Sequence, residues 1–156
     1  MKWEKNYWNL PVRWLKGKNL HITLIPPWEE ENIEKIKVAL KMIKGNVGPF
    51  EIVFEKVEFG PHFDKPRLIW AEGQPPKEII DLKNKLEKTL GVRGDTRPFQ
   101  LHLTLARFRP ETFSSFPVKQ LREEVYWLEQ VTSIVLMESH LLPKGSDYEV
   151  LEEVKL

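Results

Sequence analysis

Cysteine is absent from this chain of 156 residues. Without thiols the protein can form neither disulfides nor thiolate metal sites. No apolar run approaches the ~20 residues of a membrane-spanning helix, and the N-terminus has no signal-peptide core. The sequence therefore predicts a soluble cytoplasmic protein, and its length favours a single domain over residues 1–156. We expect a monomer with no obligate protein partner and no membrane association.

A charge excess of one sign is also missing, because 24 basic residues balance 23 acidic ones. The chain as a whole is therefore not attracted to polyanions. Basic residues nevertheless gather around two segments: Arg13, Lys16 and Lys18 precede the first, and Arg93, Arg97, Arg107 and Arg109 surround the second. Two interpretations are open: charged residues, at 30% of the composition, must lie somewhere, or the basic side chains mark two places where a phosphate group would approach.

Those two segments carry the same short pattern, His-x-Thr, at residues 19–25 and 100–106. Polar and apolar residues alternate in both, which is typical of a half-buried strand. His21 and Thr23 then share one strand face, as do His102 and Thr104. Each pair places an imidazole and a hydroxyl ~6.6 Å apart along the strand, above an apolar face that would hold them still.

The remaining pattern predicts strands and helices in an order that suggests an internal duplication. Strands are expected over residues 11–16, 50–59, 67–72, 131–138 and 148–156, and helices over 29–44, 76–90 and 117–124. We expect an α+β fold of two similar lobes, with motif strands near 19–25 and 99–107 facing each other across a cleft.

Two facing imidazoles offer a general acid and a general base near neutral pH. Threonine hydroxyls can donate to the oxygens of a bound anion, so the set suits displacement at phosphorus. A metal site is the rival interpretation, but no third ligand accompanies the two histidines in sequence. The chain also lacks a cysteine nucleophile and a Gly-x-Ser-x-Gly motif. His62 and His140 lie outside the pattern, and we expect them to be exposed.

The paired motifs resemble those of the two-histidine (2H) phosphoesterases, and within them the RNA 2′,3′-cyclic phosphodiesterases, formerly called 2′-5′ RNA ligases. The motif residues are His21-Ile22-Thr23-Leu24 and His102-Leu103-Thr104-Leu105-Ala106-Arg107. The likeness extends from Pro11 to the C-terminus through these further stretches: Val12-Arg13-Trp14, Arg67-Leu68-Ile69-Trp70-Ala71, Arg97-Pro98-Phe99, Glu138-Ser139, Leu141-Leu142-Pro143-Lys144-Gly145 and Tyr148-Glu149.

The resemblance implies a bilobal duplicated fold, with two antiparallel sheets facing across a central cleft and helices outside. It also implies hydrolysis of an RNA terminal 2′,3′-cyclic phosphate to a 2′-phosphomonoester, with no metal and no cofactor. His21 and His102 would be the acid–base pair, Thr23 and Thr104 would hold phosphate oxygens, and Arg107 would help position the phosphate. RNA ends or oligonucleotides with a cyclic phosphate are the expected partners.

Two alternatives remain open from the sequence. The same residues could carry out 2′-5′ RNA ligation or cleave 2′-5′ bonds, or the chain could bind RNA ends with weak turnover. Two departures from the family pattern also stand out. The strand and helix usual before the Arg13-Trp14 stretch are missing, so the first lobe is expected to lack a strand, and Leu101 replaces a frequent proline.

Overall fold

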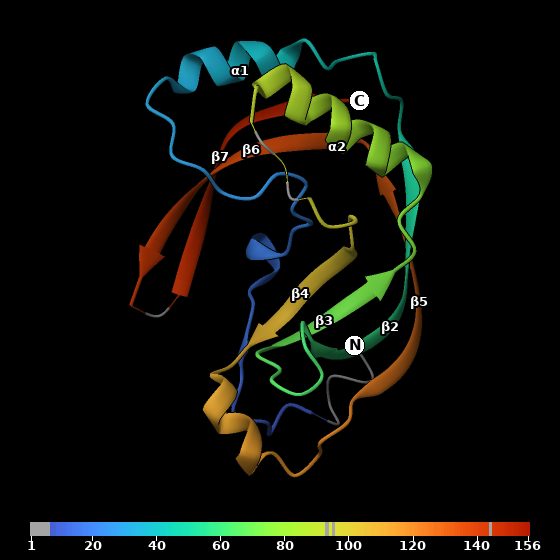
Figure 1. The fold of residues 1–156 in the computed structure, drawn as a ribbon, viewed down its shortest axis with the longest axis vertical. Coiled ribbons are helices and arrows are strands. Elements are labelled where there is room, and N and C mark those ends of the chain that lie inside the picture. Colours follow the sequence, from blue (N-terminus) through green and yellow to red (C-terminus); the bar gives the residue numbers. More distant parts are fainter. Residues whose placement is uncertain (1–6, 93, 95, 144) are drawn as a thin grey trace. The chain divides into compact units, whose positions relative to one another are not determined.

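The computed structural model describes residues 7–92, 94, 96–143 and 145–156, and the fold is α+β (Figure 1). Arg93 and the first six residues lie outside the described residues. The chain divides into two compact units. Unit 1 holds the described residues up to Ile22 together with Val53–Gln74 and Gln100–Trp127, and unit 2 holds Thr23–Ile52, Pro75–Phe99 and the residues from Leu128 onward.

The strands of a five-stranded sheet lie mostly in unit 1. Its strands lie in the order β1-β4-β3-β2-β5, with these bounds: β1 Arg13–Trp14, β2 Phe50–Gly60, β3 Leu68–Gly73, β4 Leu101–Arg107 and β5 Arg122–Val131. The pairs of β3 with β2 and with β4, and of β1 with β4, are antiparallel. The predicted strands over 11–16, 50–59, 67–72 and 100–106 are thus confirmed, although β1 is only two residues long.

The apolar face of this sheet is the core of unit 1. Val57, Ile69, Ala71, Leu101 and Ala106 are all fully buried. They occupy corresponding positions on β2, β3 and β4, so they lie on the same face. The second motif therefore stands on a rigid apolar base, as its alternation predicts.

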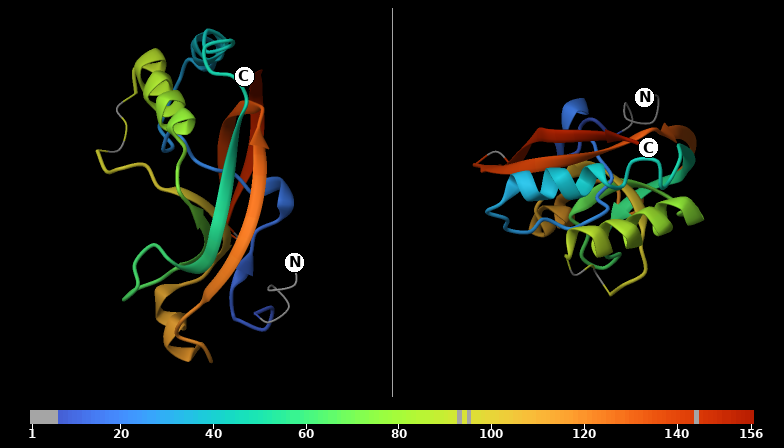
Figure 2. Two further views of the ribbon diagram at one scale, coloured as in Figure 1. Left: turned by 90° about the vertical axis from the view of Figure 1, so that its right-hand side faces the viewer. Right: turned by 90° about the horizontal axis from the view of Figure 1, so that it is seen from above.

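Unit 2 contains two helices and a hairpin. α1 spans Ile33–Lys41, α2 spans Lys77–Leu90, and a two-stranded sheet joins β6 Ser133–Leu142 to β7 Gly145–Lys155. The further views show α1 beside α2 and the long antiparallel run of β6 and β7 (Figure 2). No helix in the described part of the chain has the length and apolar character needed to cross a membrane.

Local signals explain where these helices begin and end. α2 follows Pro76 and stops at Gly91, whose left-handed φ of 66° favours glycine. α1 is shorter than the predicted 29–44, because Asn32 accepts a hydrogen bond from the Lys35 amide at 3.0 Å and caps the helix there.

Two predictions from sequence are wrong. The expected strand over 19–25 is irregular backbone, preceded by the 3₁₀ helix η2 over Gly17–Asn19. A strand needs a neighbouring strand to complete its backbone hydrogen bonds, and no described strand pairs with these residues. Pro26 and Pro27, which follow, have no backbone N–H to donate. Leu20–Ile25 are all half-buried, so the alternation does not separate two faces.

The expected helix over 117–124 is also wrong. A 3₁₀ helix, η3, spans Pro110–Ser115, and β5 begins at Arg122. Val125, Tyr126 and Trp127 are β-branched or aromatic residues that favour a strand. Their strand preference, together with pairing to the rest of the sheet, outweighs the weak helical period before them.

Candidate active site

The second motif occupies β4, and β3 supplies the side chains opposite it. His102 pairs with Glu72, and Thr104 pairs with Trp70. One strand further on, Lys56 pairs with Glu72 and Glu58 pairs with Trp70. Directly opposed residues lie on the same sheet face, so one face of the sheet carries all six side chains. This polar face is the reverse of the apolar core face.

A bulge places Arg107 on the same polar face. Ile69 pairs with Ala106 and Trp70 with Thr104, so Leu105 is the extra residue. Leu105 and Ala106 are both buried, which shows that the alternation changes phase there. Arg107 is exposed and stands opposite Arg13 of β1. Like charges directly opposite each other repel, and a bound anion would relieve that repulsion.

The first motif holds its histidine without a strand. His21 follows η2, and its Nδ1 lies 2.8 Å from the carbonyl oxygen of Asn19. His102 Nδ1 lies 2.9 Å from the carbonyl oxygen of Gln100, so each histidine bonds the residue two positions before it. Since a carbonyl can only accept, Nδ1 carries the hydrogen in both rings, and Nε2 of each neutral ring is left as an acceptor.

His21 and Thr23 of the first motif belong to different compact units. His21 and His102 both belong to unit 1, as do Thr104 and Arg107, whereas Thr23 is the first residue assigned to unit 2. Of the five residues predicted for the site, the structure brings His102, Thr104 and Arg107 together on one sheet face. His21 and Thr23 lie on irregular backbone.

Trp70 packs against the His102 ring from the neighbouring strand. The two ring centroids are 4.9 Å apart with an interplanar angle of 49°. Trp70 itself is buried, and its indole occupies the space that a Cβ on Gly60 would need. The absence of a side chain at Gly60 therefore makes room for the indole that packs against His102.

A buried carboxylate lies beside the second motif, and sequence reasoning missed it. Glu72 is only 5% exposed; its Oε2 lies 2.9 Å from Lys56 Nζ, and its Oε1 accepts a hydrogen bond from the Gln100 side chain. Lys56 Nζ also forms an ion pair with Glu58 Oε1, at 3.0 Å. A glutamate at the end of an otherwise apolar strand was the available signal, but only the register places it opposite His102.

The pKa values of Glu72 and Glu58 are shifted in opposite directions. Burial raises the pKa of Glu72, and the hydrogen bond from Lys56 opposes that rise. Burial also acts to raise the pKa of Glu58, but hydrogen bonds from Glu72 and Lys56 lower it overall. The hydrogen bond to Glu72 in turn raises the pKa of Lys56. A proton taken up by the two carboxyl groups therefore goes to Glu72 first.

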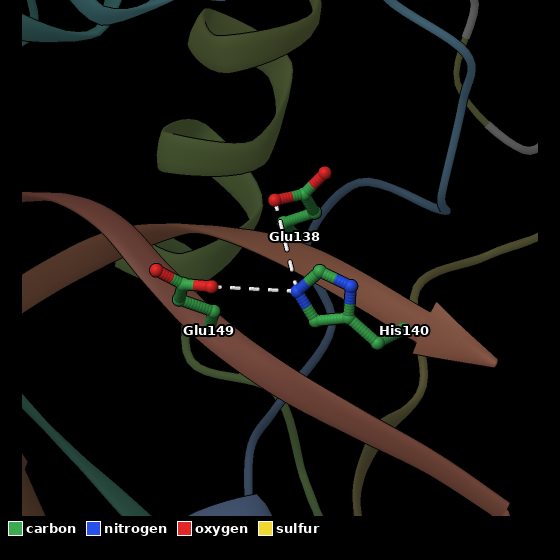
Figure 3. Close-up of side chains that lie close together, drawn as sticks. All are labelled: Glu138, His140 and Glu149. Atoms are coloured by element: carbon green, nitrogen blue, oxygen red, sulfur yellow. Dashed lines mark hydrogen bonds and ion pairs between the residues drawn. The ribbon is translucent and has the colours of Figure 1, made fainter. Parts of the chain in front are cut away.

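A separate surface group of side chains has donor atoms close enough for a metal ion. Among the described residues, Glu138, His140 and Glu149 have one donor atom each within 4.8 Å of the others (Figure 3). His140 Nε2 lies 3.7 Å from Glu138 and 3.4 Å from Glu149. All three are exposed on the β6–β7 hairpin, and exposed acidic groups are common without a bound ion. Neither motif histidine belongs to this group.

Comparison of the sequence with known families identifies its relatives. The model of the 2′-5′ RNA ligase superfamily matches residues 13–141. A protein of Archaeoglobus fulgidus named RNA 2′,3′-cyclic phosphodiesterase is 32% identical over 148 residues, covering 90% of this chain and 81% of that protein. A Bacillus subtilis protein of the same name is 30% identical over 100 residues, which are 61% of this chain and 55% of its own.

Solved structures share the fold. E. coli LigT in complex with 3′-AMP is 23% identical and superposes with a TM-score of 0.74, over 99% of this chain and 87% of LigT. The Thermus thermophilus protein TT0787 is 24% identical, with a TM-score of 0.73 over 93% of this chain and 82% of its own. At these identities the likeness concerns the fold alone.

Proposed function

Because this chain belongs to the 2′-5′ RNA ligase superfamily, we propose that it is an RNA 2′,3′-cyclic phosphodiesterase. The substrate is an RNA end or oligonucleotide with a terminal 2′,3′-cyclic phosphate, and the product is a 2′-phosphomonoester. Relatives of that name match over most of the chain. The observation that carries the proposal is a hydrogen bond that both histidines make: in each, Nδ1 donates to the backbone carbonyl of the residue two positions earlier.

In this mechanism the two Nε2 atoms divide the proton transfers. One imidazole takes a proton from the attacking water, and the other, protonated, gives a proton to the departing 3′ oxygen as the P–O3′ bond breaks. The 2′ oxygen stays on phosphorus. No cofactor enters this scheme, since the two imidazoles carry out both proton transfers.

The neighbouring side chains bind the phosphate in this proposal. Thr23 and Thr104 donate hydrogen bonds to its oxygens, and Arg107 supplies positive charge on the same sheet face as His102 and Thr104. The proposal requires His21 and His102 to face one phosphate across a cleft. The opposed Arg13 and Arg107 support an anionic substrate, because its charge would offset their repulsion.

The test is hydrolysis of a short RNA ending in a 2′,3′-cyclic phosphate, with EDTA present, from pH 5 to 9. We expect a 2′-phosphate product and a bell-shaped rate profile from the two histidines. His62→Ala, which removes an exposed histidine outside both motifs, is the matched control and should keep the wild-type rate. A 3′-phosphate product, a ligated product, or activity that EDTA abolishes would contradict the proposal.

A further inference from the structure

The buried carboxylate of Glu72 has no role in the mechanism above. Burying a carboxylate is unfavourable unless it is paired and hydrogen-bonded. In Glu72 one carboxyl oxygen forms an ion pair with Lys56, and the other accepts a hydrogen bond from the Gln100 side-chain amide. Buried ion pairs are weak contributors to stability compared with apolar residues of similar size. Stability is therefore a poor reason for a glutamate at this position of β3.

Gln100 connects this carboxylate to the second-motif histidine. Its side-chain amide donates to Glu72, while its backbone carbonyl accepts the hydrogen of His102 Nδ1 at 2.9 Å. One residue therefore holds both groups, and the position of its side chain constrains the position of its carbonyl. Gln100 is otherwise exposed, so little else fixes it.

The first motif has the same arrangement without the carboxylate. Asn19 also stands two residues before its histidine and accepts from His21 Nδ1 through its carbonyl. Its side-chain Oδ1 is buried and has no hydrogen-bond partner among the described residues. Besides their different backbones, the motifs thus differ in this: among the described residues, the residue that supplies the carbonyl is hydrogen-bonded to a carboxyl group in the second motif and not in the first.

We propose that Glu72 is a positioning residue for His102 and acts through Gln100. The inference rests on the proposed function, in which His102 transfers a proton at Nε2. Glu72 holds the Gln100 amide, the Gln100 carbonyl keeps hydrogen on His102 Nδ1, and Nε2 is left as the atom that exchanges a proton with substrate or water. Lys56 holds the Glu72 side chain from the opposite side, through an ion pair of 2.9 Å.

Three substitutions separate the parts of this connection. Gln100→Met removes the amide but keeps the backbone carbonyl, and because Gln100 is exposed it leaves the core intact. Glu72→Leu removes the acceptor, whereas Glu72→Gln keeps an oxygen that can accept from Gln100. We expect Gln100→Met and Glu72→Leu to lower kcat roughly 10- to 100-fold with little change in KM, the scale on which misplaced catalytic groups lose rate. Glu72→Gln should retain most of the wild-type kcat.

Coupling to His102 distinguishes positioning from a structural effect. In a His102→Ala background, Gln100→Met and Glu72→Leu should cause no further loss, because the group they position is gone. Glu87→Gln is the matched control, since it removes another ion pair with a buried lysine, Lys83, on α2. Its kcat should equal that of the wild type at a temperature where all variants are folded.

The ¹⁵N resonances of the His102 ring give a readout that needs no turnover. Gln100→Met and Glu72→Leu should raise the fraction of rings that carry hydrogen on Nε2, and Glu87→Gln should not. A wild-type kcat in Gln100→Met, an equal loss in the His102→Ala background, or an unchanged tautomer would each overturn the inference. An inactive wild-type enzyme would instead contradict the proposed function, and the tautomer measurement would still decide the inference.

Discussion

The two His-x-Thr motifs have nearly the same sequence and very different backbones. The second is a strand paired with β3 along its whole length, while residues 20–25 of the first form no strand. Both nevertheless give their histidine the same hydrogen bond to the carbonyl two residues before it. The comparison teaches that this local bond, and not the strand, is what the two motifs share. We therefore expect loss of either histidine to lower the rate to a similar extent, whereas truncation of the residue before each histidine should lower the stability by different amounts.

Loss of either imidazole is the largest expected effect. His21→Ala and His102→Ala should each lower the rate of cyclic phosphate hydrolysis at least ~100-fold, because each removes a proton-transfer group. Similar losses would show that irregular backbone presents a catalytic histidine as well as a strand does. The rates are measured with the RNA substrate described above, beside the His62→Ala control. A near-normal rate in one variant would remove that histidine from the mechanism.

Truncation of the apolar residue before each histidine should separate the motifs by stability. Leu101 is fully buried, so Leu101→Ala is expected to cost about 2–5 kcal/mol in the free energy of unfolding. Leu20 is only half-buried, and Leu20→Ala should cost about 1 kcal/mol. Urea unfolding of both variants measures the two values. Equal costs would mean that residues 20–25 are packed as firmly as β4.

Much of this asymmetry was outside the reach of the sequence. The limits of α2 follow from Pro76 and Gly91, which act on the chain next to them, and β4 follows from its alternation over a core. The segment around His21 has the same alternation, but a strand also needs a partner, which no local pattern reports. Glu72 was missed for a related reason, since only the pairing of β3 with β4 places it opposite His102. His102, Thr104 and Arg107 were predicted because each belongs to the motif itself.

Hydrogen exchange tests the backbone difference directly. Amides in β4 take part in a ladder with β3, whereas those of residues 20–25 lie outside the sheet. We expect a peptide covering 101–107 to exchange at least about tenfold more slowly than one covering 20–25. The β6–β7 hairpin provides a reference for paired strands in the same sample. Equal protection would show that the first motif forms hydrogen bonds comparable to a strand, and the comparison would then fail.

The smallest expected effect concerns the chain that leads to the first motif. Tyr7 donates a 2.5 Å hydrogen bond to Glu123 of β5, and this bond raises the pKa of Tyr7 from 10.0 to about 12. A raised pKa means that the folded state holds the proton more tightly. The stabilisation is therefore complete below pH 10 and is lost as the pH rises from 10 through 12.

Tyr7 is partly exposed, so solvent screening limits the contribution of this bond to about 1 kcal/mol or less. Tyr7→Phe should lower the free energy of unfolding by that amount at pH 8 and by less at pH 11.5. Urea unfolding at the two pH values, with Tyr126→Phe on an exposed tyrosine of β5 as control, measures the difference. If Tyr7→Phe caused no loss at pH 8, any contribution of Tyr7 would come from its ring, which phenylalanine keeps, and the anchoring of the first motif would not depend on the hydroxyl.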